Sequence, residues 1–423
     1  MREMKDSGIE WIGEIPKDWC VKNGKYVFNV YGMSVNDDFI SDTVEESYKI
    51  KYYKVDNLNE ATEQFYVKSN FANFSIKIYE IKGPIILVPK RGGAIYTNKV
   101  RIEKEACLFD SNIMGLTTNN NVRFMAYVLY GRGLSDIGDV TTIPQINKKH
   151  IDVLKIPVPS INEQEVIVEY LDTKCSEIDA TAEDIQKEIT LLEDYKKSLV
   201  YNVISNGINH SIYSTESDEV WGNLPQGWKL VDIKYLFEIV KRIAVKEGYD
   251  VLSVTQKGLK IKDITSGDGQ LADNYCGYQF VYPTDYVMNH MDLLTGWVDC
   301  SELFGVTSPD YRVFRLIDRS AHNLVYYKYV MQCCYMNKIF YSLGQGVSNL
   351  GRWRLQTSSF NNFKIPVPPK DEQDEIADYL DTKCSEIDSL IADKKRQLDI
   401  LADYKKSLIY EYVTGKKEVP VNE

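Results

Sequence analysis

The sequence predicts an α+β fold with two mixed α/β globular blocks. The blocks are separated by two long helices packed as an antiparallel coiled coil, and the whole forms a pseudo-twofold internal repeat. Three observations predict this fold: the length of the chain, a repeat with an offset of 209 residues, and an apolar seam within each repeated segment.

At 423 residues the chain is too long for a single hydrophobic core, so two or more domains are expected. Hydrophobic residues make up 44% and charged residues 26%, which fits a globular protein and excludes a mainly disordered one. No stretch approaches the ~18 apolar residues of a membrane span, and the first residues are charged. We therefore expect a cytoplasmic protein without a membrane partner.

The repeat consists of two similar segments, which we call the frame segments. Residues 156–159 (Ile-Pro-Val-Pro) recur at 365–368, 170–179 recur unbroken at 379–388, and 25 of the 44 positions from 156 to 199 are identical at the offset of 209. Upstream, Pro16-x-x-Trp19 returns as Pro225-x-x-Trp228. Residues 29–142 and 238–351 show no such alignment. We call these two divergent segments the inserts. Similar frames with divergent inserts are expected if both frames bind the same kind of partner and the two inserts bind different targets.

The repeat divides the chain into consecutive segments. The predicted boundaries are 1–155 for the first block, 156–205 for the first frame helix, 206–220 for an exposed connector, 221–364 for the second block, 365–414 for the second frame helix and 415–423 for a tail.

The frame segments have the signals of long helices. Prolines 157, 159, 366 and 368 exclude helix just before them, and Asn162 and Asp371 have N-cap spacing to an acid three residues later. Apolar residues then recur in steps of three and four, with interruptions at lysines, over about 40 residues or roughly 60 Å. The densely charged opposite faces favour mutual packing over packing of each helix on its own block alone. The residues predicted to pair the helices are Leu171, Ile178, Ile185, Ile189, Leu192, Leu199, Leu380, Ile387, Ile391, Leu398, Leu401 and Leu408.

Each block has a mixed pattern. We predict strands at 85–88, 278–282, 287–288 and 311–316, and helices at 122–130 and 324–340.

The net charge of −11 belongs to the frame helices. Segments 160–205 and 369–414 carry −7 and −5, whereas 12–155 and 221–364 carry +2 and +3. The overall acidity therefore does not exclude binding of nucleic acid by the blocks, although neither block is basic enough to bind it tightly alone.

Common catalytic patterns are missing from the sequence. There is no phosphate-binding Gly-x-x-x-x-Gly-Lys-Ser/Thr run, and Ser308-Pro-Asp-Tyr311 matches the amino-methyltransferase signature only in part. The eight cysteines include no Cys-x-x-Cys pair, and the four histidines lie far apart. We predict no catalytic residue, no metal site and no cofactor.

Candidates for DNA contact lie in short polar clusters within the blocks. Arginine and lysine bind phosphate or guanine, and asparagine and glutamine can read adenine in the major groove. Each cluster taken alone also fits an ordinary solvated surface. The candidates are Lys90, Arg91, Asn98, Lys148, Lys149, Asn289, Gln345, Asn349, Arg352 and Arg354.

These patterns together resemble the specificity (S) subunit of type I restriction-modification systems. The resemblance rests on Ile-Pro-Val-Pro followed by Glu-Gln in both copies, on Tyr-Leu-Asp and Tyr-Lys-Lys-Ser-Leu in the frame helices, and on the Pro-x-x-Trp that opens each copy. In the second block, residues 252–255, 289–292 and 305–311 also look similar to that family. In the first block, 89–93 matches more loosely.

The resemblance implies two target recognition domains, each reading half of a bipartite site on double-stranded DNA, with the helices as a ruler for the gap. It implies two copies of a methyltransferase (M) subunit and restriction (R) subunits as partners, which hold the catalytic activities. Two alternatives remain: a coiled-coil scaffold whose blocks bind other partners, and an enzyme with its active site in one block.

Overall fold

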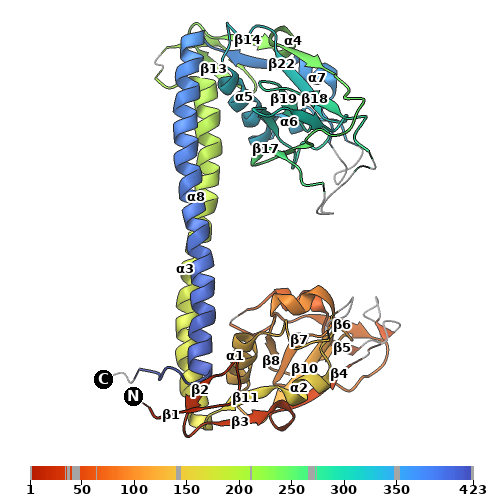
Figure 1. The fold of residues 1–423 in the computed structure, drawn as a ribbon, viewed down its shortest axis with the longest axis vertical. Helices are drawn as coiled ribbons and strands as arrows, with labels where there is room; N and C mark the ends of the chain where they lie inside the picture. Colours follow the sequence, from red (N-terminus) through yellow and green to blue (C-terminus); the bar gives the residue numbers. More distant parts are fainter. Residues whose placement is uncertain are drawn as a thin grey trace. The chain divides into compact units, whose positions relative to one another are not determined.

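The computed structural model describes residues 2–33, 35, 39–40, 48–62, 64–139, 144–209, 212–264, 272, 274–346 and 353–420. The chain folds into two compact units (Figure 1). The first unit comprises Met1–Gln186 with Arg396–Glu423, and the second comprises Lys187–Lys395. The two long helices, α3 (Ile161–Asn206) and α8 (Lys370–Val413), each contribute residues to both units.

The first unit is built on an antiparallel four-stranded sheet in the order β4-β10-β7-β8, beside a three-stranded sheet β6-β5-β9 and the pairs β1–β2 and β3–β11. Its elements besides the long helices are β1 (Met4–Asp6), β2 (Glu14–Pro16), β3 (Cys20–Asn23), η1 (Gly24–Tyr26), β4 (Phe28–Gly32), β5 (Tyr48–Tyr53), η3 (Val55–Asn59), β6 (Phe71–Phe74), β7 (Ile85–Pro89), η4 (Gly92–Thr97), β8 (Arg101–Glu103), β9 (Leu108–Phe109), β10 (Ile113–Thr118), α1 (Val122–Arg132), α2 (Lys148–Val153) and β11 (Lys155–Val158).

The second unit is built on an antiparallel sheet in the order β15-β22-β19-β20, with the pairs β12–β13, β14–β23, β16–β17 and β18–β21 around it. Its elements besides the long helices are β12 (Tyr213–Asp218), β13 (Gly222–Pro225), β14 (Lys229–Asp232), α4 (Ile233–Leu236), β15 (Phe237–Val240), β16 (Leu252–Thr255), β17 (Gly258–Ile261), β18 (Gln279–Val281), β19 (Tyr286–Met288), β20 (Val298–Cys300), β21 (Gly305–Thr307), β22 (Arg312–Leu316), α5 (Leu324–Met336), α6 (Ile339–Ser342), α7 (Thr357–Asn362) and β23 (Lys364–Val367).

The two central sheets have the same strand order although their sequences do not align. In each, the first strand pairs with the last, which pairs with the second, which pairs with the third. The repeat also begins upstream of the Pro-x-x-Trp motifs. Met4 pairs with Pro16 in the first unit, and Tyr213 pairs with Pro225 in the second, so a strand precedes the motif at the same offset of 209 residues in both. The segment 206–220, predicted as an exposed connector, therefore contains strand β12. The blocks differ in sequence while their architecture is shared.

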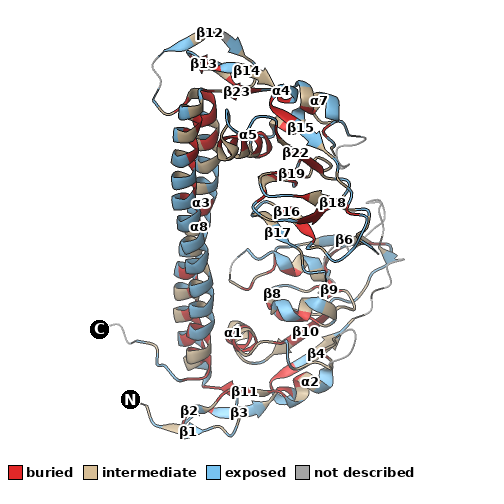
Figure 2. Ribbon diagram, turned by 45° about the horizontal axis from the view of Figure 1, so that its top comes forward, coloured by how far each residue is buried: buried red, intermediate tan, exposed pale blue. Residues whose placement is uncertain are grey.

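Each unit has its own hydrophobic core, to which both long helices contribute (Figure 2). In the first core, Trp19 and Tyr127 pack with Leu171 of α3 and Tyr412 of α8. In the second, Val203 of α3 and Leu380 of α8 join Trp221, Tyr286 and Tyr326. The helices thus pack on the blocks as well as on each other.

The antiparallel direction of the helix pair follows from ion pairs within each unit. In the first unit Lys405 Nζ lies 2.7 Å from Asp179, and in the second Lys196 Nζ lies 2.7 Å from Asp388. Residue numbers rise along one helix as they fall along the other. The predicted α+β fold, with its paired helices and internal repeat, is confirmed.

The Glu-Gln dipeptide of each frame joins the helix start to its block. Glu163 accepts a hydrogen bond from Trp19 Nε1 at 2.9 Å, and Glu372 accepts one from Trp228 Nε1 at 3.0 Å. The next residue is a buried glutamine, whose Oε1 accepts from the backbone N–H that precedes α1 or α5, at 2.9 Å in both units. The repeated sequence therefore encodes a repeated docking contact.

Two local predictions were wrong. Asn162 and Asp371 lie inside the first turns of α3 and α8 and are not N-caps; the hydroxyl of Ser160 accepts from the Glu163 N–H at 3.3 Å instead. The predicted helix 324–340 is divided into α5 and α6, because Lys338 takes up a left-handed φ of 56°. Over the residues that the structure covers, no helix combines the length and apolarity that crossing a bilayer requires.

Candidate nucleic-acid interface

In the first unit, the loop after β7 presents two of the predicted DNA contacts. The buried strand β7 ends at Pro89, and the backbone of Lys90 is then held on both sides: its N–H donates to the Asn112 carbonyl at 2.7 Å, and its carbonyl accepts from the Ile146 N–H at 2.9 Å. Arg91 follows and is exposed, with its backbone bridged to Gln145. A fixed backbone thus carries two cationic side chains, a half-buried lysine and an exposed arginine.

The other first-unit candidates already have intramolecular partners. Asn98 has a left-handed φ of 49° and donates its amide to the Tyr130 carbonyl at 2.8 Å. Lys148 pairs with Asp152 at 2.7 Å, and Lys149 pairs with Asp139 at 2.9 Å. Both lysine side chains stay more than 60% exposed, so these ion pairs are weak and solvent-screened.

In the second unit, three candidates gather beside the loop after β19. Asn289 follows β19 directly, and the next residue, His290, accepts a backbone hydrogen bond from Leu355 at 3.0 Å. Gln345 and Arg354 exchange backbone hydrogen bonds of 3.0 and 3.1 Å, and both side chains are exposed. The remaining two candidates, Asn349 and Arg352, lie outside the described residues.

The two loops occupy corresponding places in the two units. Ile146 and Leu355 are 209 residues apart, and their N–H groups donate to the carbonyls of Lys90 and His290 respectively. β7 and β19 also hold the same position in their sheets. The fold therefore brings unlike side chains, a Lys-Arg pair in one unit and an Asn-His pair in the other, to equivalent positions.

A buried cation lies behind the second loop. Arg312 donates to the Leu355 carbonyl at 3.0 Å and lies 4.5 Å from the centre of the Phe360 ring. Burial lowers its pKa to about 10. Burial is also the main cause that lowers the pKa of His290 to about 3, and the positive charges of Arg312 and Arg354 contribute. His290 is therefore uncharged at neutral pH.

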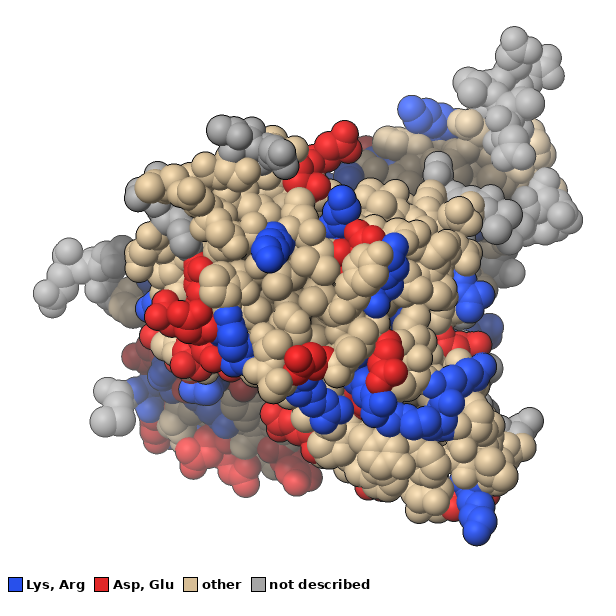
Figure 3. All heavy atoms as spheres, turned by 90° about the horizontal axis from the view of Figure 1, so that it is seen from above, with Lys and Arg blue, Asp and Glu red and all other residues tan. Residues whose placement is uncertain are grey.

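The three second-block segments that carry the family resemblance line one pocket. Its volume is about 270 Å³, and Asn289 is among its lining residues. From these three segments, the lining residues are Leu252, Ser253, Asn289, Met291, Asp292, Ser308, Asp310 and Tyr311. Val251, Lys262 and Tyr278, which lie just outside β16, β17 and β18, complete the lining. On the face shown in Figure 3, lysines and arginines are interspersed with acids.

The comparison with known families identifies the family of the chain. The family model described as the type I restriction modification DNA specificity domain matches twice, at residues 16–191 and 225–399. The chain belongs to this family. Each match covers one block and most of its frame helix, so each copy of the internal repeat is one specificity domain.

Similar proteins cover nearly the whole chain. The type I restriction enzyme MjaVIII specificity subunit of Methanocaldococcus jannaschii is 23% identical over 431 residues, covering 96% of this chain and 94% of its own. The putative MjaX specificity subunit of the same organism is 24% identical over 437 residues, covering 96% of both chains. A solved chain described under "Structural basis underlying complex assembly and conformational transition of the type I R-M system" has a TM-score of 0.66 at 13% identity, covering 94% of this chain and 98% of its own, and shows the same fold.

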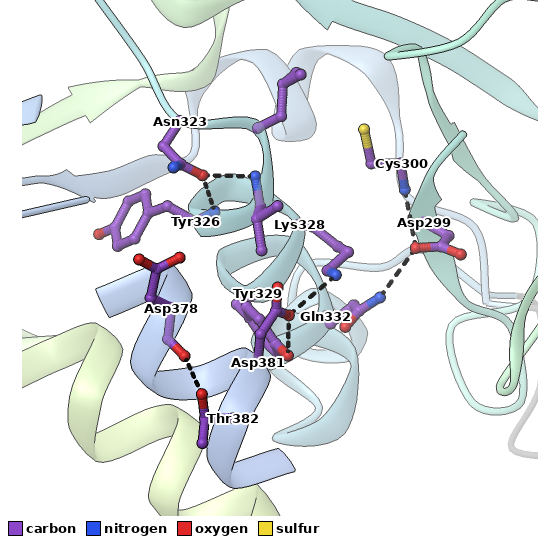
Figure 4. A network of polar contacts seen from close by, with 12 residues as sticks. Asp299, Cys300, Asn323, Tyr326, Lys328, Tyr329, Gln332, Asp378, Asp381 and Thr382 are labelled. Carbon is purple, nitrogen blue, oxygen red and sulfur yellow. Dashed lines mark hydrogen bonds and ion pairs between the residues drawn. The ribbon is translucent and has the colours of Figure 1, made fainter. Parts of the chain in front are cut away.

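Both specificity domains anchor their block to the frame helix through one repeated tyrosine–aspartate contact. In the second domain the Tyr329 hydroxyl donates to Asp381 at 2.7 Å, and Lys328 lies 3.5 Å from the same carboxylate (Figure 4). In the first, the Tyr127 hydroxyl donates to Asp172 at 2.8 Å. Asp172 and Asp381 are 209 residues apart, whereas the tyrosines lie in the inserts that did not align. Sequence comparison could therefore find only one side of the contact.

The predicted helix-pairing residues of the two specificity domains are all buried or partly buried in α3 and α8. The buried members are Leu171, Ile178, Ile189, Leu380, Ile387, Ile391 and Leu408. Partly buried are Ile185, Leu192, Leu199, Leu398 and Leu401. Lys196 and Lys405, which interrupt the apolar pattern, form the ion pairs with Asp388 and Asp179.

Proposed function

We propose that this chain is the DNA specificity subunit of a type I restriction-modification complex and that its two blocks each read one half of a bipartite, asymmetric site on double-stranded DNA. The observation that carries the proposal is the pair of specificity domains with the same sheet order and unlike residues at the same loop position. Equivalent loops with different side chains suit two different half-sites.

The DNA contacts follow from the chemistry of these loops. Lys90 and Arg91 supply two positive charges, and arginine can bind guanine through two hydrogen bonds. Asn289 and Gln345 carry amides suited to adenine, with Arg354 beside them. Because the blocks carry net charges of only +2 and +3, we expect a partner subunit to share the phosphate contacts.

The helix pair has a different role in the proposal. Its segments are acidic, which disfavours contact with phosphates and suits contact with proteins. Because the frame is repeated, it offers two equivalent surfaces, as two copies of one M subunit would need. The R subunits join this assembly. The chain itself is non-catalytic, and the helices fix the unread gap between the half-sites.

The test is to co-express the full chain with the M subunit of the same system and to map methylated adenines across the host genome. The expected result is one split motif with a constant gap, absent when either protein is omitted. A continuous motif, or no methylation beyond that of the M subunit alone, would contradict the proposal and favour a scaffold that binds other partners.

A further inference from the structure

The turn at residues 308–311 in the second block is held by hydrogen bonds within its backbone and from one buried side chain. The Tyr311 N–H donates to the Ser308 carbonyl at 3.1 Å, which closes the turn. The amide of Gln279, which is only 2% exposed, donates to the Ser308 and Tyr311 carbonyls at 2.9 and 2.7 Å. A buried side chain that satisfies two backbone carbonyls fixes the position of the turn before any ligand arrives.

Asp310 of this turn lines the 270 Å³ pocket, which Asn289 also lines. Asp310 is exposed, and its N–H donates to the Ser308 hydroxyl at 3.2 Å. Within the part of the chain that the structure describes, its carboxylate has no hydrogen-bond donor and no cation at ion-pair distance. The fold thus holds the backbone that carries an unpaired acceptor beside a polar pocket.

The other aspartate of the pocket, Asp292, differs because its carboxylate accepts hydrogen bonds from its own loop. One Asp292 oxygen accepts from the N–H groups of Leu294 and Thr295, each at 3.0 Å, and the other accepts from the Thr295 hydroxyl. Asp292 therefore stabilises its own loop. The turn of Asp310 is instead closed by Gln279 and Ser308, without its carboxylate.

An acid at a DNA-binding surface is repelled by phosphates, so its favourable partners are base edges that donate hydrogen bonds. In the major groove these donors are the exocyclic amino groups, N4 of cytosine and N6 of adenine. Guanine and thymine present acceptors or a methyl group there, and a carboxylate opposite them would lose its hydration without gaining a hydrogen bond.

We infer that Asp310 selects a base with an exocyclic amino group, cytosine or adenine, at one position of the half-site read by the second block. This inference rests on the proposed function and adds to it a specificity-determining residue and the class of base that this residue accepts.

The experiment compares the wild-type full chain with Asp310→Ala and with Glu302→Ala, each co-expressed with the M subunit. Glu302 is the matched control, because it is an exposed acid of the same block that does not line the pocket. Methylated sites are mapped genome-wide, and binding to duplexes with all four base pairs at each half-site position is measured at fixed salt.

In the wild type we expect one position of the second half-site to require cytosine or adenine on one strand. In Asp310→Ala the preference at that position should fall by about tenfold, equivalent to about 1.4 kcal/mol, because the carboxylate that accepts from the amino group is gone. All other positions should be unchanged, and Glu302→Ala should keep the full wild-type preference.

The first half-site is the internal control for folding and assembly, because it is read by the other block. If Asp310→Ala keeps the first half-site and every preference of the second, Asp310 does not read a base and the inference is overturned. A uniform gain in affinity with a changed salt dependence would likewise overturn it, since Asp310 would then act only by repelling phosphate. Absence of any motif in the wild type would instead refute the proposed function.

Discussion

His290 is an uncharged side chain placed next to two arginines, directly after the predicted reader Asn289. The sequence indicated Asn289 as a candidate for DNA contact but did not predict the neutral state of His290. Burial is the main cause that lowers the pKa of His290 to about 3, and the positive charges of Arg312 and Arg354 contribute. Both arginines lie near His290 in the fold but far from it in the sequence. Asn98 is the reverse case: its amide fits base reading in principle, but the structure uses it on the Tyr130 carbonyl. Residue type predicts what a side chain can bind, and the non-local fold decides whether it is available.

The lowered pKa predicts an acid-sensitive second unit. Between about pH 6.5, where a histidine of the unfolded chain titrates, and about pH 3, the unfolded state binds one more proton than the folded state. Stability is therefore lost as the pH falls through this window, by about 1–2 kcal/mol at pH 5. His290→Gln, which cannot be protonated, should lose less on going from pH 7.5 to pH 5 in urea unfolding. Parallel losses in the two proteins would contradict the prediction.

The long helices were the elements best predicted from the sequence, because a period of three and four residues is a local signal. Their caps were predicted wrongly, since Ser160 lies one residue before the helix and two before the chosen Asn162. The strands of the blocks were found only in part. Elements such as β8 have three residues and depend on pairing with distant strands, so their sequences carry little local pattern.

The helix pair gives a prediction with a matched control. Leu192 and Leu401, equivalent in the repeat, are partly buried, so Leu192→Asp with Leu401→Asp places two carboxylates on the covered sides of the helices. We expect a loss of about 1–3 kcal/mol per site and loss of the complex with the M subunit, measured by urea unfolding and by size-exclusion chromatography.

The control variant changes the preceding residue in each helix, Leu191→Asp with Ile400→Asp. These side chains are 68% and 59% exposed, so the unfolding free energy should be nearly unchanged. An intact complex in the Leu192 and Leu401 variant, or equal destabilisation of both variants, would contradict the assigned helix-pairing role.

At the scale of the whole molecule, the proposed spacer role predicts that the length of the helices sets the gap in the DNA site. Deleting residues 186–192 of α3 and 392–398 of α8 removes matched heptads, since Glu188 in the first segment pairs with Lys394 in the second. Seven residues of helix measure about 10.5 Å, equivalent to about three base pairs.

The deletion variant is tested on duplexes that hold both half-sites at every gap length up to that of the wild type. The preferred gap should shorten while both half-sites stay the same. A matched deletion that leaves the preferred gap unaltered would count against the spacer role.

The repeat predicted the fold class of the molecule, but not how the chain is shared between the units. Each copy looks contiguous in sequence, yet the first core includes Leu408, Ile409, Tyr412 and Val413 from the far end of the chain. Motifs show which segments resemble each other. They do not show that each block takes its last helical turns from the other copy, because that contact depends on long-range packing.

This sharing has a consequence for synthesis on the ribosome. The second unit is one continuous stretch, so its core can close once residue 395 has left the exit tunnel. The amino-terminal block emerges earlier but cannot complete its core until the residues around Val413 appear. Completion of the first core therefore waits for the last turns of α8, whereas the second core is complete without them.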